Sequence, residues 1–140
     1  MRRILVIVFL LNVVNEENVT AQVPETLAYL QSVVANKAQF VGQPFSVLRD
    51  SLKIQIKYFS PFGSISYDIT KETSTSFSFF FPQTINDLYL TYPKLDIFWR
   101  PPYLDNQQAH SLYNQYHGGW TQIVATHYNS GIIADIKIRE

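Results

Sequence analysis

The chain of 140 residues carries 11 basic and 11 acidic side chains and no cysteine. Without cysteine there is no disulfide and no lipid attached through an N-terminal cysteine, so stability has to come from packing. The charges are scattered without runs, so the sequence lacks the basic stripe that binds nucleic-acid phosphates. The same balance provides no attraction to an anionic membrane surface.

The N-terminal segment is typical of an export signal. Two arginines precede an apolar run over residues 4–14, and Val19-Thr20-Ala21 forms the small-residue pattern that signal peptidase cuts. The apolar run is roughly half the length of about 20 residues that a membrane span needs. The alternative is a strand or helix of the folded domain. We expect a signal peptide over residues 1–21, one domain over 22–140, and no membrane span in the mature form.

The absence of cysteine also bears on location. Small exported domains of animals usually carry disulfides. An exported chain without them fits a Gram-negative bacterium better, either in the periplasm or outside the cell.

Two helices are predicted at the start of the mature chain. Apolar residues recur at helical spacing over residues 24–38, at Leu27, Leu30, Val34 and Ala38. Gly42 can adopt the left-handed conformation that ends a helix, and Pro44 can open the next one. A short second helix then follows over residues 45–52.

Beyond Lys53 the period changes to two, which predicts strands. We expect a strand over residues 53–59 that is closed by Pro61 and Gly63, and a turn at Lys71-Glu72-Thr73. The stretch Thr73 to Pro82 raises a separate question, because it contains four phenylalanines. Three of them share one face of a strand, which indicates a buried sheet face, with Phe80 alone pointing the other way; the three are Phe77, Phe79 and Phe81.

The C-terminal half alternates in two places. Residues 94–99 form a predicted strand with Leu95, Ile97 and Trp99 inward and Asp96 and Phe98 outward. The last strand, over residues 132–139, places four residues inward: Ile132, Ala134, Ile136 and Ile138.

Between those strands the pattern is weaker. Thr84 can cap one turn of helix. Residues 103–119 have no clear period and are predicted to be irregular. Residues 120–128 fit a strand or a helix, and we favour a strand because residues 129–131 then form a hairpin connection.

This order of elements predicts an α+β domain. Two N-terminal helices would pack on one face of a four- to five-stranded, mainly antiparallel sheet. The other face would stay partly wet, and basic residues such as Lys137 and Arg139 suit it.

Motifs for catalysis are scarce. The three histidines, His110, His117 and His127, match no zinc spacing. No Gly-x-Ser-x-Gly elbow occurs, and the sequence around Ser64 lacks the second glycine. Phosphate loops and dinucleotide fingerprints are absent. We therefore predict no catalytic residue, no metal and no cofactor, and the sequence favours a protein that is not an enzyme.

Aromatic residues gather around the segment predicted to be irregular. Flat amphipathic rings suit both sugar faces and protein partners, although large rings also fill the cores of small domains. The candidate ligand- or partner-binding residues are Trp99, Tyr103, Tyr113, Tyr116, His117 and Trp120.

Three segments carry a resemblance to known proteins. Through Ala21-Gln22, the FVGQPFSVL segment and the closing NSGIIADIKIRE, the chain resembles uncharacterised small secreted proteins of Bacteroidota. More distantly, residues 42–52 are similar to the turn and second helix of beta-lactamase inhibitor protein and of outer-membrane-assembly lipoproteins, whose lipidated cysteine is missing here. That likeness implies a binding or inhibitory module.

Two function classes follow. The first is a non-enzymatic module that binds another periplasmic or extracellular protein through the wet sheet face or residues 103–120. The second is a carbohydrate-binding or glycan-processing domain, in which aromatic rings stack on sugars and Asp96 or Asp105 binds their hydroxyl groups.

Overall fold

The computed structural model describes residues 19–63, 69–80 and 92–139. Its strands are β1 (Tyr58–Phe62), β2 (Lys71–Glu72), β3 (Ser74–Ser78), β4 (Lys94–Trp99), β5 (Leu104–Asp105) and β6 (Ile133–Arg139). Its helices are α2 (Val19–Ala35), the 3-10 turn η1 (Lys37–Gln39), α3 (Phe45–Ser51), α4 (Asn106–Tyr116) and α5 (Gln122–Tyr128).

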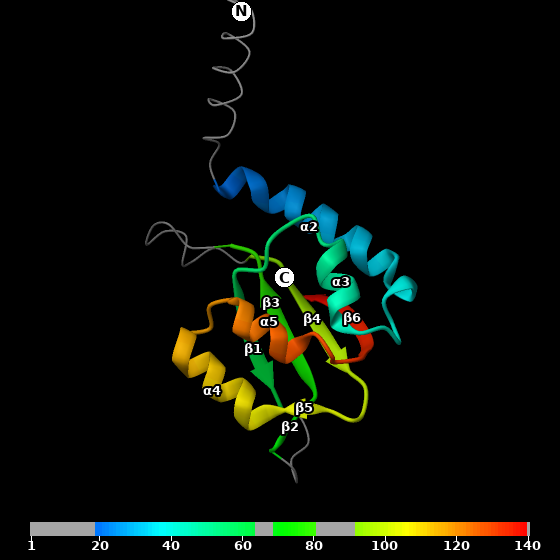
Figure 1. The fold of residues 1–140 in the computed structure, drawn as a ribbon. Helices are drawn as coiled ribbons and strands as arrows, with labels where there is room; N and C mark the ends of the chain where they lie inside the picture. Colours follow the sequence, from blue (N-terminus) through cyan, green and yellow to red (C-terminus); the bar gives the residue numbers. More distant parts are fainter. Residues whose placement is uncertain (1–18, 64–68, 81–91, 140) are drawn as a thin grey trace, which may run out of the picture.

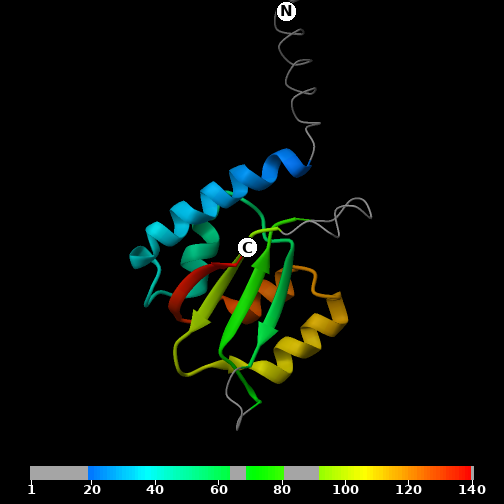
Figure 2. The ribbon, with the colours of Figure 1, turned by 180° about the vertical axis from the view of Figure 1, so that it is seen from behind.

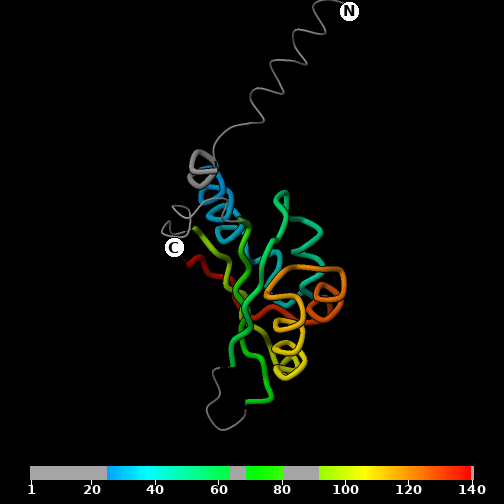
Figure 3. Tube along the Cα trace, turned by 90° about the vertical axis from the view of Figure 1, so that its left-hand side faces the viewer, coloured from blue at the N-terminus to red at the C-terminus, as the bar shows by residue number. Residues whose placement is uncertain are grey.

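The predicted α+β class is confirmed. One antiparallel sheet has the strand order β1-β3-β4-β6, and β2 pairs separately with β5 (Figure 1). Viewed along the sheet in Figure 3, α3, α4 and α5 lie on one side of the strands. Figure 2 shows the other side from behind, with β1, β3 and β4 uncovered below α2. We call these the core face and the open face.

The second predicted helix is found close to its expected bounds, whereas the first, predicted over residues 24–38, begins five residues earlier and ends three residues earlier, before the 3-10 turn η1. α3 covers Phe45–Ser51, and Gly42, with a φ of 85°, provides the left-handed turn before it. α2 begins at Val19, ahead of the predicted cleavage boundary, and ends at Ala35. Its buried residues are Leu30 and Val33. No helix in the described part of the chain combines the length and the apolar character needed to cross a membrane.

The first strand was predicted about five residues too early. Residues 53–57 are not strand, and β1 runs through Pro61, which was expected to close it. Proline has no N–H for a ladder, but an edge strand tolerates it. β1 is such an edge, so the chain continues paired with β3 as far as Phe62, opposite Ser74.

The segment 103–119 was wrongly predicted to be irregular. It contains β5 and the whole of α4, whose buried residues Ala109 and Leu112 are three apart. The Asp105 side chain accepts hydrogen bonds from the backbone N–H groups of Gln107 and Gln108, at 2.9 and 3.2 Å, and so caps the helix.

The strand favoured for residues 120–128 is also wrong. Thr121 accepts a bond from the Val124 N–H at 3.3 Å and opens helix α5, which buries Val124, Ala125 and Tyr128. Residues 129–131 therefore connect a helix to β6 and do not form a hairpin.

The final strand is confirmed with one shift in its inward face. The register between β4 and β6 slips between Phe98 and Trp99, which pairs Trp99 with Ile133. Such a bulge adds one residue to a strand and changes which side chains point inward. Ile133 is consequently fully buried, in place of the predicted Ile132 and Ala134.

Aromatic rings fill the space between the core face and its helices. Phe77 of β3 stacks on Phe45 of α3, with ring centroids 4.9 Å apart. Tyr128 of α5 packs edge-on against Phe77 at 5.6 Å and stacks on Trp99 at 5.9 Å. Phe79 and Phe80 are both at least nine-tenths buried. Phe80 lines the opposite, open face with Ser76 and Ser78, as predicted, and is buried there because it stacks on Tyr92. Phe81 and the Thr84 turn lie outside the described residues.

Gly131 allows the chain to pass close to Trp99. A Cβ atom at this position would lie 2.8 and 2.9 Å from two carbon atoms of the Trp99 ring. The ring is buried and cannot move aside, so we expect Gly131→Ala to lower the free energy of unfolding by about 1 to 3 kcal/mol. Urea denaturation measures this. Ser130→Ala, at the exposed neighbouring position, should change stability by less than about 0.5 kcal/mol. Equal stability of the two variants would contradict the close packing.

Candidate ligand site on the open face of the sheet

Small side chains occupy the middle of the open face. Directly paired residues of antiparallel strands point to the same face. Ser60 of β1 pairs with Ser76 of β3, and Ser78 pairs with Tyr58. Because three serines stand where larger residues would cover the strands, the face is hollowed here. We call this depression, which has a volume of about 620 Å³, the serine hollow.

Aromatic rings from four parts of the chain surround the serine hollow. Phe80 and Tyr92 stack with their centroids 4.7 Å apart. Phe62 and Tyr113 line it as well, and they are 39% and 38% exposed. Large rings exposed at the edge of a depression are typical of contact surfaces, since burial of each ring stabilises a complex.

The C-terminus of α4 carries two further residues to this edge. His117 adopts a left-handed conformation with φ of 53°, and Gly118 follows with φ of 76°. The Gly118 carbonyl accepts a bond from the Phe59 N–H at 2.9 Å, which fixes the turn to β1. A Cβ at Gly118 would lie 2.9 Å from the Tyr113 ring. Glycine therefore lets Tyr113 rest against the backbone beside the hollow.

A left-handed conformation is unfavourable for a residue with a side chain and is often found at functional sites. His117 is such a residue, and its side chain lines the serine hollow. Glycine adopts this conformation without the steric cost that a side chain carries.

The charged groups of the open face are unevenly paired. Arg139 of β6 donates from Nε and Nη2 to Oδ2 of Asp96, at 3.0 and 2.9 Å. The Arg139 guanidinium also lies 5.4 Å from the centre of the Phe62 ring. Lys94 is directly opposite Arg139 in the β4–β6 pairing. Asp96 was predicted to be a solvated outward position, but it is only 8% exposed because Arg139 covers it.

Two buried polar atoms of this face have no hydrogen-bond partner within the described part of the chain. They are Oγ of Ser76 and Oδ1 of Asp96, whose residues are paired across β3 and β4. Ser76 is 3% exposed. Ser76 lines the hollow, whereas Asp96 is buried beside it and holds Arg139. Buried polar groups are normally bonded, so Oγ of Ser76 provides capacity for a polar group that enters the hollow.

The structure separates the six residues predicted to bind a ligand or partner. Tyr113 and His117 both line the serine hollow. Trp99 is 3% exposed and belongs to the core. Trp120, Tyr103 and Tyr116 are half-buried and pack against that core.

The serines, Phe62 and Lys94 were not predicted to be site residues. A signal was available for part of the set. Ser76 and Ser78 alternate with Phe77 and Phe79 along the chain, and alternating serines on a strand leave room above it.

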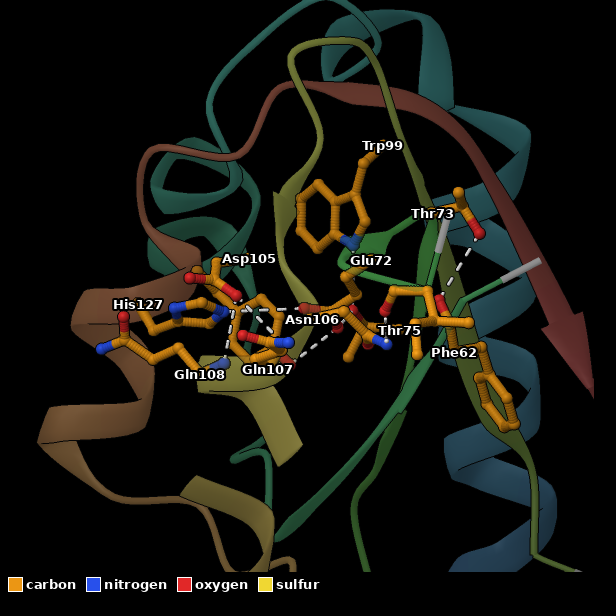
Figure 4. A network of polar contacts seen from close by, with 12 residues as sticks. Phe62, Glu72, Thr73, Thr75, Trp99, Asp105, Asn106, Gln107, Gln108 and His127 are labelled. Atoms are coloured by element: carbon orange, nitrogen blue, oxygen red, sulfur yellow. Dashed lines mark hydrogen bonds and ion pairs between the residues drawn. The ribbon is translucent and has the colours of Figure 1, made fainter. Parts of the chain in front are cut away.

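The second polar cluster lies inside the core. Glu72 was predicted to stand in a turn, but it belongs to β2 and is fully buried. Its Oε2 accepts hydrogen bonds from the hydroxyls of Thr75 and of Tyr128, the latter at 2.8 Å. The indole N–H of Trp99 in turn donates to the Thr75 hydroxyl at 2.9 Å, and Figure 4 shows this nitrogen facing Glu72 and Thr75. Burial, together with the neighbouring Glu72 carboxyl group, raises the pKa of the Tyr128 hydroxyl far above its ordinary value.

His127 completes this core cluster. Its Nε2 lies 3.6 Å from Oε1 of Glu72, and its side chain is 7% exposed. General acid–base catalysis requires that such a group reach the reacting atoms of a substrate. Among the described residues this is the one imidazole with a carboxyl group as an ion-pair partner, and it is closed off from the serine hollow by the sheet.

The described residues contain no group of three histidine, aspartate or glutamate side chains placed to share a metal ion. Asp105, which was predicted as a residue that could bind sugar hydroxyls, caps α4 through its carboxylate.

No family model, no curated protein and no solved structure matches the chain.

Proposed function

We propose that this protein is an exported, non-enzymatic binding module that takes a small polar ligand in the serine hollow. The observation that supports it best is the combination of the unpartnered Ser76 hydroxyl with exposed rings around one depression. A volume of about 620 Å³ falls within the range of small-molecule sites, about 300 to 1,000 Å³. Export rests on the predicted signal peptide over residues 1–21.

The proposal keeps the predicted arrangement in which the helices of residues 24–52 cover one face of the sheet. Leu30 of α2 and Phe45 and Leu48 of α3 all belong to the hydrophobic core. With the core on that side, the opposite face is left for binding. A protein partner or an inhibitory role, as the resemblance implies, would use the same face.

Filling the hollow tests the proposal. Ser78→Trp places an indole over the floor without touching the core face, so the fold should be retained. We expect small polar compounds that shift the backbone amide NMR signals of β1 and β3 in the wild type to cause no shift in the variant. A suitable panel contains monosaccharides, disaccharides, amino acids and dipeptides. Ile123→Ser is the control, because Ile123 is 59% exposed on α5, on the other side of the sheet.

Equal shifts in the wild type and in Ser78→Trp would place binding elsewhere. A pull-down with the wild type and Ser78→Trp as baits distinguishes a small ligand from a protein partner. Capture of one protein by the wild type alone, with no response to any small compound, would favour the protein-binding alternative.

A further inference from the structure

We infer that the ligand of the serine hollow is an anionic saccharide, a sugar unit that carries a carboxylate or sulfate group. This inference rests on the proposed function, since it names the ligand class for the same site. Three features of the hollow carry it: the arrangement of two cations, the chemistry of the floor and the exposed rings.

The two cations are placed unfavourably for the protein alone. Lys94 and Arg139 are directly opposite each other on β4 and β6, and like charges in that position destabilise a sheet. Arg139 is relieved by Asp96, whose carboxylate it binds through two nitrogen atoms. Lys94 is exposed and has no hydrogen-bond or ion-pair partner among the described residues. An anion at this edge of the hollow would remove the repulsion and would pair with Lys94.

The same strands offer a contrast nearby. Lys137 is directly opposite Asp96, an arrangement of opposite charges, and its ammonium lies 5.1 Å from the centre of the Phe98 ring. It does not line the hollow. The uncompensated positive charge therefore belongs to the hollow and is not a general property of this face.

The serines of the floor favour a ligand with hydroxyl groups. Oγ of Ser76 can both donate and accept, and it lacks a partner within the described residues. A hydroxyl of a pyranose can exchange a hydrogen bond with this serine. A cationic ligand such as an amine would be repelled by Lys94 and Arg139, which also line the hollow.

The rings supply the apolar contact that a sugar needs. Phe62 and Tyr113 are exposed at the hollow, and the apolar C–H face of a pyranose packs on such rings. Free phosphate or sulfate would satisfy Lys94 but would leave the rings and the floor unused. The combination of anion, hydroxyls and apolar face favours an acidic sugar.

Two probes that differ at one carbon test the inference. They are methyl α-galactopyranosiduronate, which has a carboxylate, and methyl α-galactopyranoside, which has a neutral hydroxymethyl group in its place. We expect NMR titration of the mature chain at low salt to show binding at the hollow, with at least about tenfold higher affinity for the acidic probe. Added salt should reduce that ratio.

Matched variants assign the preference to residues. Lys94→Gln should bring the two affinities to within about threefold, whereas Lys137→Gln, which removes the same charge from the same face, should leave the ratio unchanged. Ser76→Ala should weaken both probes to a similar degree. His117→Gly relieves the left-handed residue and should retain or raise the melting temperature, so any loss of binding in it reports on contact with the ligand.

Equal affinity for the two probes would overturn the inference, as would an equal effect of Lys94→Gln and Lys137→Gln. If neither sugar binds but other small compounds respond to the filled hollow of Ser78→Trp, the ligand class is wrong and the site stands. If no compound distinguishes Ser78→Trp from the wild type, the site itself is wrong.

Discussion

Glu72→Met should lower the free energy of unfolding by about 3 kcal/mol or more, although methionine is apolar and similar in size. Glu72 is fully buried, and its Oε2 accepts from both Thr75 and Tyr128. Without the carboxyl group, two buried hydroxyls lose their acceptor, and the chain of bonds from the Trp99 indole ends at Thr75. Urea or thermal denaturation measures the loss.

A second substitution distinguishes lost hydrogen bonds from poor packing. Tyr128→Phe removes one of the two donors, so in the Glu72→Met background it should cost less than it does in the wild type, by about 1 kcal/mol. Strictly additive losses would indicate that Glu72→Met acts through shape alone. A loss below about 1 kcal/mol for Glu72→Met would contradict the buried carboxyl cluster itself.

Phe77→Ala should destabilise the protein by about 3 to 5 kcal/mol. Phe77 is 1% exposed, stacks on Phe45 and packs edge-on against Trp120 and Tyr128, both at 5.6 Å. Its removal leaves a cavity between the sheet and two helices that cannot close without moving rigid rings. The midpoint of urea denaturation should fall with little change in slope.

Phe98→Ala provides the matched control. Phe98 is a phenylalanine on a central strand as well, but it points to the open face, is half-buried and lies under the Lys137 ammonium. Its loss should cost about 1 to 1.5 kcal/mol. If Phe77→Ala were no more harmful than Phe98→Ala, the assignment of the core face would be reversed.

Strong periodicity made part of the fold predictable. In β4 the apolar residues alternate with Asp96 and Phe98, which predicts one face of the strand in the core. The structure buries that face, formed by Leu95, Ile97 and Trp99, in the core. Helix α3 follows a turn at Gly42, where the left-handed backbone is confirmed. In these elements local pattern and tertiary packing agree.

The errors arise where local pattern and tertiary contacts diverge. Helix α4 is rich in glutamine and asparagine and buries few residues, so its helical period was overlooked although Asp105 stands at the cap position. The bulge at Phe98 and Trp99 depends on two strands at once, and no single strand reveals it. Glu72 was misread because a charged residue beside lysine usually marks a turn, whereas here two hydroxyls in the core receive it.

The candidate site was predictable only in part for a related reason. Tyr113 and His117 belong to one segment and could be found together, but their neighbours in the hollow come from β1, β3, β4 and β6. Lys94 and Arg139 are 45 positions apart along the chain and become neighbours only through the β4–β6 register. The sequence indicates which residues of a strand share a polar face, but it does not show which residues of other strands lie beside them.

The outer side of β1 limits how this protein can associate with others. The Phe59 N–H donates to the Gly118 carbonyl at 2.9 Å, the Trp120 N–H donates to the Lys57 carbonyl at 3.0 Å, and Pro61 has no N–H to offer. Among the described residues of this edge, the Phe59 N–H is therefore already bonded and Pro61 offers none, so a strand of another molecule has fewer backbone groups with which to pair.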